Sequence, residues 1–256
     1  MTMMTRKLIQ LDTIGSTNVY LSEHASMFQE DMVVVVADYQ TSGKGQGQHS
    51  WESESGKNLL FSILIHPHHV PIHHQFLLSM AGALSIKRVL DEYVDDISLK
   101  WPNDIYWRDS KLCGTLIENT VDSQGIKNSI FGIGLNVNQA RFLSDAPNPV
   151  SLFQILKHEV NRKKLLEQLI DSFARQLDLL SIYPQKYVVK PYHESLYRKG
   201  EAHLYQDSNG IFMAILEGVN EQGQLLLRDE QGHLRTYSFK EVAFIHTEKK
   251  NYYYIK

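Results

Sequence analysis

The chain has 256 residues, 43% of them hydrophobic and 21% charged, and its formal net charge is −3. These values are typical of a globular protein with one large domain and a small appendage, or with two ordinary domains. The charge balance provides no basic surface for non-specific nucleic-acid binding. No apolar run approaches the roughly 20 residues of a membrane-spanning helix, and the N-terminus lacks the apolar core of a signal peptide. Cys113 is the single cysteine, so an internal disulfide is excluded and we expect a cytoplasmic protein.

The first predicted elements are a strand, a helix and a second strand. Lys7–Thr13 is expected to be a short strand. Ser16 or Thr17 can cap the following helix, which we expect to run to about Phe28, because a hydroxyl oxygen can accept a free N–H group at a helix start. Met32–Tyr39 contains four consecutive valines, a pattern that favours a strand buried on both faces.

A glycine-rich segment, 40–51, follows this strand directly. Gly43, Gly45 and Gly47 alternate with polar residues, and glycines allow backbone N–H groups to converge on an anion. The segment lacks the Gly-Lys-Ser/Thr of a Walker loop. It is therefore either a flexible surface loop or a phosphate-binding loop of another kind. Trp51 ends the segment, and a flat ring beside phosphates suits a purine.

The middle of the chain continues with strands and helices. Phe76, Met80 and Leu84 repeat every four residues, which indicates the core-facing side of a helix. We expect strands at Asn58–His66, Ser98–Lys100, Leu112–Val121 and Ser129–Val137, and helices at Gln75–Tyr93 and Lys163–Ile182.

A group of histidines follows the first of these strands, within nine residues: His66, His68, His69, His73 and His74. Such a group could hold a metal ion. However, two prolines interrupt it, the spacing is irregular, and neither acidic nor cysteine ligands accompany it. We therefore favour a solvated loop and expect no metal site made by the protein alone.

Two polar stretches interrupt the predicted strands. In Lys100–Asp104, a strand must end or bulge at Pro102, and Asn103-Asp104 suits a turn. Taken alone, this stretch is an ordinary hairpin corner. In Gly132–Asn138, glycines alternate along a predicted strand, which usually marks a place where a ligand or another backbone must fit.

From about Gly200 the pattern changes. Short apolar runs are separated by Asn209-Gly210, Gln222-Gly223 and Gln231-Gly232, which predicts a small all-β barrel. The boundary is expected between Pro191 and Gly200, so that residues 1–195 form a first domain and 196–256 a second.

Four motifs, standing in one order, resemble those of the biotin–protein ligases. They are Ser16-Thr17-Asn18, the loop 43–51 that ends in tryptophan, Lys100–Asp104 followed by Lys111, and the Gly-Ile-Gly-x-Asn-x-Asn strand 132–138. Lys-Trp-Pro-Asn-Asp is highly specific, whereas Ser-Thr-Asn alone would identify nothing. The resemblance covers nearly the whole chain. It implies an α+β fold, with a mixed sheet packed against helices and a small C-terminal SH3-like β-barrel.

The resemblance also implies a two-step reaction. The biotin carboxylate attacks the α-phosphorus of ATP, with Mg²⁺ on the phosphates, to give biotinyl-5'-AMP and pyrophosphate. The ε-amine of a carrier lysine then attacks this mixed anhydride. The expected carrier is the biotin carboxyl carrier protein of acetyl-CoA carboxylase, or the carrier domain of a similar carboxylase. Cations and backbone N–H groups must offset the repulsion between the two anions.

Roles for individual residues follow from the resemblance. The catalytic cation would be Lys111, and Asp104 would organise the turn or the approach of the acceptor. Biotin would be bound by Ser16, Thr17, Asn18, Gln40, Lys44, Gly45, Gln46, Lys111, Gly114 and Gly132. ATP and the adenylate would be bound by Gly43, Lys44, Gln46, Trp51, Asn103, Lys111 and Asn136.

The sequence departs from the family pattern in its loop, which is usually Gly-Arg-Gly-Arg-x-Gly-Arg. Lys44 keeps the first positive charge, but Gln46 and His49 replace the other arginines. Because arginine makes bidentate phosphate contacts, we expect weaker retention of the adenylate than in an arginine-rich relative. Some family members add an N-terminal helix-turn-helix repressor module. Only 15 residues precede Ser16, so we expect no DNA binding.

Two other functions are compatible with this fold. A lipoate–protein ligase or octanoyltransferase would be expected to show an Arg-Arg-x-Ser-Gly-Gly-Gly segment, which is absent. Acyl transfer through a thioester would need a reactive Cys113, but a cysteine between Leu112 and Gly114 in an apolar strand is typical of a core residue. A non-catalytic biotin sensor is the third hypothesis, and the intact Lys111 argues against it.

Overall fold

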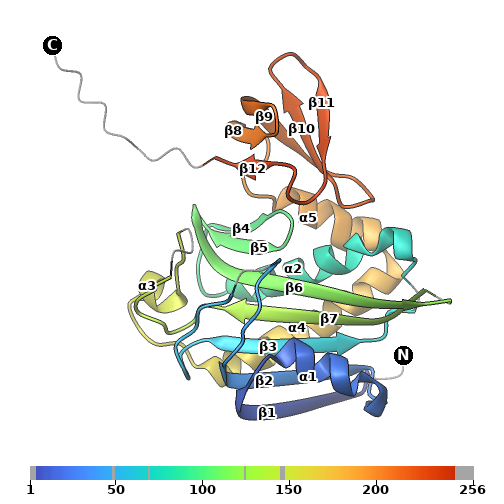
Figure 1. The fold of residues 1–256 in the computed structure, drawn as a ribbon, viewed down its shortest axis with the longest axis vertical. Helices are drawn as coiled ribbons and strands as arrows, with labels where there is room; N and C mark the ends of the chain where they lie inside the picture. Colours follow the sequence, from blue (N-terminus) through green and yellow to red (C-terminus); the bar gives the residue numbers. More distant parts are fainter. Residues whose placement is uncertain (1–3, 48–49, 69, 124, 145–147, 246–256) are drawn as a thin grey trace.

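A seven-stranded sheet forms the largest part of the computed structural model, which describes residues 4–47, 50–68, 70–123, 125–144 and 148–245 (Figure 1). The strand order is β1-β2-β3-β7-β6-β5-β4. The strands are β1 (Arg6–Ile14), β2 (Met32–Gln40), β3 (Leu59–Ile65), β7 (Gly125–Leu135), β6 (Ser110–Asp122), β5 (Asp104–Trp107) and β4 (Ile97–Lys100). β1 and β2 are parallel, whereas every other neighbouring pair is antiparallel. The mixed sheet predicted from the resemblance is confirmed.

The parallel pair requires a crossover connection, which α1 (Thr17–His24) and a short 3₁₀ helix (Ala25–Met27) provide. The α-helix therefore ends earlier than the predicted Phe28. His24 Nδ1 lies 2.8 Å from the carbonyl oxygen of Tyr20, so this side chain meets the last turn of the helix.

The two faces of the sheet are covered by different helices (Figure 1). On one face α1 places Leu21 against Val33, Val35, Leu64 and Ile130. On the other face lie α2 (Phe76–Leu90) and α4 (Arg162–Ile182), where Phe131 and Phe173 meet edge to face at 4.9 Å between ring centroids. Successive strand residues point to opposite faces, which explains why the valines of β2 are buried on both sides.

Several predicted elements have different limits. A 3₁₀ helix (Ile72–His74) precedes the predicted helix 75–93, and α2 begins at Phe76 and ends at Leu90. Lys100–Asp104 is a hairpin corner between β4 and β5, with a cis peptide bond between Trp101 and Pro102. The elements without a prediction are β5, α3 (Leu152–Leu156), a π-helical turn (Gln185–Val189) and α5 (Lys190–Glu194). In the described part of the chain, no helix is both long and apolar enough to cross a bilayer.

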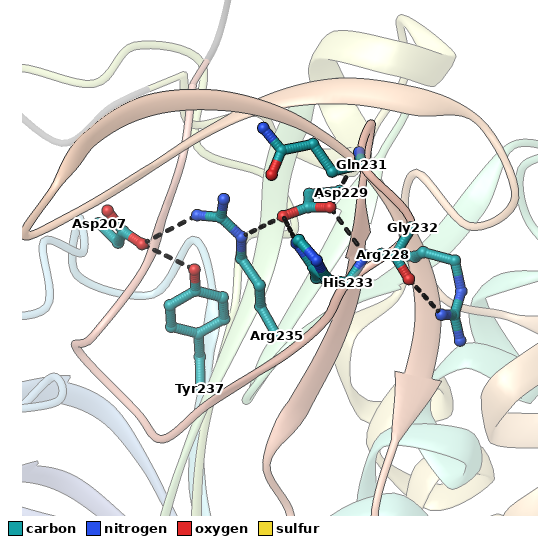
Figure 2. A network of polar contacts seen from close by, with 8 residues as sticks. All are labelled: Asp207, Arg228, Asp229, Gln231, Gly232, His233, Arg235 and Tyr237. Carbon is teal, nitrogen blue, oxygen red and sulfur yellow. Dashed lines mark hydrogen bonds and ion pairs between the residues drawn. The ribbon is translucent and has the colours of Figure 1, made fainter.

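A second, antiparallel sheet follows, with the strand order β11-β10-β9-β8-β12. Its strands are β8 (Ala202–Asp207), β9 (Gly210–Val219), β10 (Leu225–Asp229), β11 (Leu234–Tyr237) and β12 (Ala243–Phe244). This arrangement is consistent with the predicted SH3-like barrel. Figure 2 shows a polar network inside it, in which Arg235 lies between the carboxylates of Asp207 and Asp229.

The β4 edge contacts the segment 195–197 that leads to the second sheet, and the corner after β4 contacts the second sheet itself. The backbone N–H of Leu99 donates to Ser195 O (2.8 Å), and that of Tyr197 donates to Leu99 O (2.9 Å). Trp101 Nε1 donates to the carbonyl of Gly223, in the β9–β10 turn, at 2.8 Å. Since residues 195–197 pair with the first sheet, the domain boundary at 195/196 stays a prediction.

Candidate functional site

The site begins where α1 starts, against the end of β2. Ser16, Thr17 and Asn18 are 6%, 3% and 3% exposed. Ser16 occupies the N-cap position, but its side chain makes no capping bond. Instead, Gln40 Oε1 accepts the backbone N–H of Thr17 at 2.7 Å. The prediction of a hydroxyl cap is wrong, because an amide from a neighbouring strand satisfies the helix start.

A chain of polar contacts leads from this helix across the sheet. Thr17 Oγ1 lies 2.6 Å from Ser62 Oγ, and Ser62 Oγ donates to Asn18 Oδ1 at 2.6 Å. Asn18 Nδ2 then donates to Glu118 Oε2 at 2.7 Å. Ser62 pairs with Gly132 across β3 and β7, and a Cβ added to Gly132 would overlap the Asn18 amide. Gly132 therefore leaves the space that Asn18 occupies.

A pair of glycines forms a floor under Trp51. Gly114 and Gly134 face each other across β6 and β7. A Cβ on Gly114 would lie 2.8 Å from Trp51 Cζ3, and a Cβ on Gly134 would overlap the indole. Both glycines thus permit close approach of a flat ring. Trp51 Nε1 is buried without a hydrogen-bond partner among the described residues.

Lys111 and Asp104 form an ion pair beside this floor. Lys111 Nζ lies 2.8 Å from Asp104 Oδ1, and both side chains are largely buried. The same Nζ lies 5.5 Å from the Trp51 ring centroid. Asp104 pairs with Gly114, and the ladder between β5 and β6 shifts register after Ile105. A β-bulge of this kind redirects a side chain, and here it accompanies the placement of Lys111 beside Asp104.

The backbone of Lys111 is fixed by residues 148–150. Its N–H donates to Asn148 O (2.8 Å), and Val150 N–H donates to Lys111 O (2.9 Å). Asn136 joins the same segment, because its Nδ2 donates to Val150 O at 3.0 Å. Asn136 Oδ1 is buried and has no partner within the described ranges. The amide oxygen can therefore accept a bond from a ligand.

Asn103 faces the protein backbone. Its side-chain amide donates to Thr115 O, while Thr115 N and Thr115 Oγ1 both donate to Asn103 O at 3.0 Å. These bonds hold the corner against β6. The predicted contact of Asn103 with ATP stays a prediction.

The glycine-rich loop lies beside Gln40 and Trp51. Trp51 N–H donates to Gly43 O at 3.0 Å, and Gln40 Nε2 lies within 3.5 Å of the Cβ position of Gly43. Lys44 is exposed, whereas Gly45 and Gln46 are half-buried. His49 lies outside the described residues. The loop is thus placed between the polar chain at α1 and the glycine floor.

Burial shifts the pKa values of two groups next to the site. Lys100 Nζ donates to Tyr106 OH at 2.8 Å and lies 4.6 Å from the Tyr106 ring centroid, and burial lowers the pKa of Lys100. Burial raises the pKa of the Cys113 thiol. A protonated, buried thiol is a poor nucleophile, which argues against the thioester hypothesis.

The histidines after β3 are dispersed among several partners. His66 Nδ1 lies 2.8 Å from Asn128 Oδ1, and His74 Nε2 lies 3.8 Å from Glu221. Within the described residues, no three His, Cys, Asp or Glu side chains gather around a common point. His69 lies outside these residues.

The structure brings the predicted residues into two neighbouring groups: one around Asn18 and Gly132, the other around Trp51 and Lys111. The prediction missed three residues, namely Ser62, Glu118 and Gly134. Ser62 is the single polar residue of the otherwise apolar β3, a signal that could have identified it. Gly134 follows Gly132 by two residues, so both lie on one face of β7.

Comparison with known proteins agrees with this geometry. Residues 11–137 match the model of the "Biotin/lipoate A/B protein ligase family". The chain is 33% identical to the biotin–[acetyl-CoA-carboxylase] ligase of Mycobacterium tuberculosis, over 69% of this chain and 67% of that protein. It is 27% identical to the bifunctional ligase/repressor BirA of Bacillus subtilis, over 92% and 73%. The solved structure of the Aquifex aeolicus biotin protein ligase in complex with biotin and ATP has a TM-score of 0.77 and 26% identity, covering 94% of this chain and 99% of that one. The chain belongs to the biotin/lipoate A/B protein ligase family.

Proposed function

We propose that this protein attaches biotin to a lysine of a biotin carrier domain, using ATP and a biotinyl-5'-AMP intermediate. The observation that carries the proposal is the pairing of two adjacent groups on one sheet face. Asn18 stands over Gly132 with Thr17 next to it in the chain, and Lys111 stands beside Trp51 over the Gly114–Gly134 floor. The first group suits a small polar ring, and the second suits a purine and its phosphates.

The first step joins two anions, so the site must reduce their repulsion. A carboxylate oxygen of biotin attacks the α-phosphorus of ATP, the bond to the β-phosphate oxygen breaks, and pyrophosphate leaves. Lys111 supplies the positive charge nearest the glycine floor, and Asp104 holds its ammonium in place. The loop 43–46 adds Lys44 and backbone N–H groups. Mg²⁺ would be held mainly by the ATP phosphates, as is usual for this ion.

The second step transfers the biotinyl group. The carrier lysine amine attacks the carbonyl carbon of the mixed anhydride, AMP leaves, and the amine loses a proton as the amide forms. Asp104 organises the corner that borders this reaction. Water must be kept from the anhydride, and we expect the described loop residues 43–47, beside Gln40 and Trp51, to help cover it.

The carrier is the biotin carboxyl carrier protein of acetyl-CoA carboxylase or a similar carboxylase domain. The names of the relatives support this choice, because two of them are biotin–[acetyl-CoA-carboxylase] ligases. We further propose a cytoplasmic location, no DNA-binding role, and a division of labour in which residues 1–195 hold the ligase site.

One assay separates the three hypotheses. The protein is incubated with ATP, Mg²⁺ and either biotin or lipoate, and pyrophosphate release and labelling of a carrier domain are measured. Biotin-dependent pyrophosphate release and carrier labelling are expected. Release with lipoate alone would indicate a lipoate ligase. Biotin binding without pyrophosphate release would indicate a sensor, and either result would overturn the proposal.

A further inference from the structure

In the row of polar contacts beneath α1, the chemistry of the side chains determines which atom donates and which accepts each hydrogen bond. An ionised carboxylate only accepts hydrogen bonds, so the part of the Asn18 amide that faces Glu118 must be the NH₂ group. Asn18 Oδ1 is thereby turned toward Ser62, whose hydroxyl donates to it at 2.6 Å. The single hydroxyl proton of Ser62 is then used in its hydrogen bond to Asn18.

The use of the Ser62 proton also determines which atom donates in the contact between Ser62 and Thr17. The Thr17 hydroxyl has one proton and two neighbouring oxygens, Ser62 Oγ at 2.6 Å and Gln40 Oε1 at 3.0 Å. Ser62 has no second proton, so the short contact with Thr17 is a hydrogen bond only if Thr17 donates. Gln40 Oε1 keeps the backbone N–H of Thr17, at 2.7 Å.

These hydrogen-bond assignments determine which donors and acceptors remain for a ligand. Asn18 retains a second N–H that donates to no described residue. Thr17 Oγ1 and Gln40 Oε1 retain lone pairs. One donor thus stands near two acceptors, on the side of the sheet where Asn18 fills the space above Gly132.

We propose that Ser62 and Glu118 are positioning residues that orient this donor and these acceptors toward the ureido group of biotin. A ureido group offers one carbonyl oxygen and two N–H groups, the complement of that pattern. The inference rests on the proposed function, which supplies biotin as the ligand. Ser62 is fully buried and Glu118 is exposed, so the two residues can be tested in different surroundings.

The alternative is that both residues only attach α1 to the sheet. In that case their removal would weaken every ligand equally, or would destabilise the fold without selecting among ligands. Three ligands distinguish the two explanations. Biotin and desthiobiotin both carry the ureido oxygen, whereas in 2-iminobiotin a nitrogen replaces it.

The experiment uses the full chain and measures the dissociation constants of the three ligands by calorimetry without ATP. The variants are Ser62→Ala, Glu118→Ala and Glu118→Gln, with Thr120→Ala as the control, since Thr120 is an exposed residue of the same strand as Glu118. Biotin-dependent pyrophosphate release and the KM for ATP are measured in parallel, and thermal unfolding reports on the fold.

Ser62→Ala should weaken biotin and desthiobiotin about tenfold each, the size of one lost hydrogen bond. Glu118→Ala should weaken them about threefold, because its bond is only partly buried. Both variants should bind 2-iminobiotin with less change, so that discrimination between biotin and 2-iminobiotin falls. Glu118→Gln retains an acceptor oxygen and should restore discrimination, and the KM for ATP should not change.

Three results would overturn the inference: unchanged biotin affinity in both alanine variants, equal weakening of all three ligands, or failure of the wild-type chain to bind biotin. If the wild-type chain binds biotin but releases no pyrophosphate, the proposed function fails. The binding measurements then still decide the inference.

Discussion

Two polar clusters of this molecule, one in each sheet, differ in how completely the protein satisfies them. In the second sheet, Asp229 Oδ1 accepts the backbone N–H groups of Gln231 and His233, and its Oδ2 accepts from Arg235 Nε at 2.9 Å (Figure 2). The carboxylate is therefore surrounded by its own turn and strand. No ligand is needed to complete it.

The cluster in the first sheet is incomplete. Trp51 Nε1 and Asn136 Oδ1 are buried without partners among the described residues, and within the same residues one N–H of the Asn18 amide donates to Glu118 while the other has no acceptor. A buried polar atom without a partner costs free energy, and a ligand that supplies the partner recovers it. The saturated cluster thus stabilises the fold, whereas the incomplete one is suited to binding.

The largest expected effect is on Lys111. Lys111→Ala removes the cation beside the glycine floor, so biotin-dependent pyrophosphate release should fall by about 10²–10³-fold. The control is Lys127→Ala, which removes an exposed lysine of β7, and circular dichroism reports on the fold. Near-normal turnover in a folded Lys111→Ala protein would assign the catalytic charge elsewhere.

The next effect concerns the space over Gly132. Gly132→Ala places a methyl group against the Asn18 amide, so the affinity for biotin should fall at least about tenfold. Gly15→Ala is the matched control, because no atom lies within 4 Å of the Cβ position of Gly15. Calorimetric titration with biotin measures both variants. Equal affinities would show that Asn18 can move without loss, and that the incomplete cluster does not select the ligand.

These two predictions differ in how much the sequence alone could supply. Lys111 follows the specific Lys-Trp-Pro-Asn-Asp motif, so the family resemblance is enough to predict a role for it. The overlap at Gly132 depends on the register of β3 against β7, which pairs Ser62 with Gly132. A strand interior gives little sign of which partner it will face, since register follows from the whole sheet. The ion pair of Lys111 with Asp104 likewise follows from a register shift that no local pattern announces.

A smaller effect is expected in the loop. Gln46→Arg restores a cation that can contact phosphate bidentately, so dissociation of biotinyl-5'-AMP should become several-fold slower. The wild-type chain should accordingly release the adenylate faster than an arginine-rich relative. Stopped-flow chase with unlabelled adenylate measures both rates. An equal or slower wild-type rate would show that backbone amides and Lys111 suffice.

The saturated cluster of the second sheet should make the free energy of unfolding depend on pH under acidic conditions. Hydrogen bonds from Tyr237 and Arg235 are among the contacts that lower the pKa values of Asp207 and Asp229 below their ordinary 3.8. A carboxylate with a lowered folded pKa stabilises the fold above its unfolded pKa, and this contribution is lost as the pH falls through the folded value. The free energy of unfolding, measured with urea between about pH 2 and 5, should therefore decrease as the pH is lowered. Asp229→Asn should reduce this slope, and an unchanged slope would contradict the assignment.

The smallest expected effect separates the two clusters most directly. Tyr237→Phe removes one hydroxyl, which donates to Asp207 Oδ2 at 2.7 Å, and keeps the ring that stacks on Phe212. The melting temperature should fall by about 2–4 °C, while the KM for biotin and the rate of pyrophosphate release stay unchanged. If the KM changed as well, the second sheet would be coupled to the site through the contact between Trp101 and Gly223. A variant Trp101→Phe, which removes that hydrogen bond together with part of the buried ring, would then have to reproduce the change.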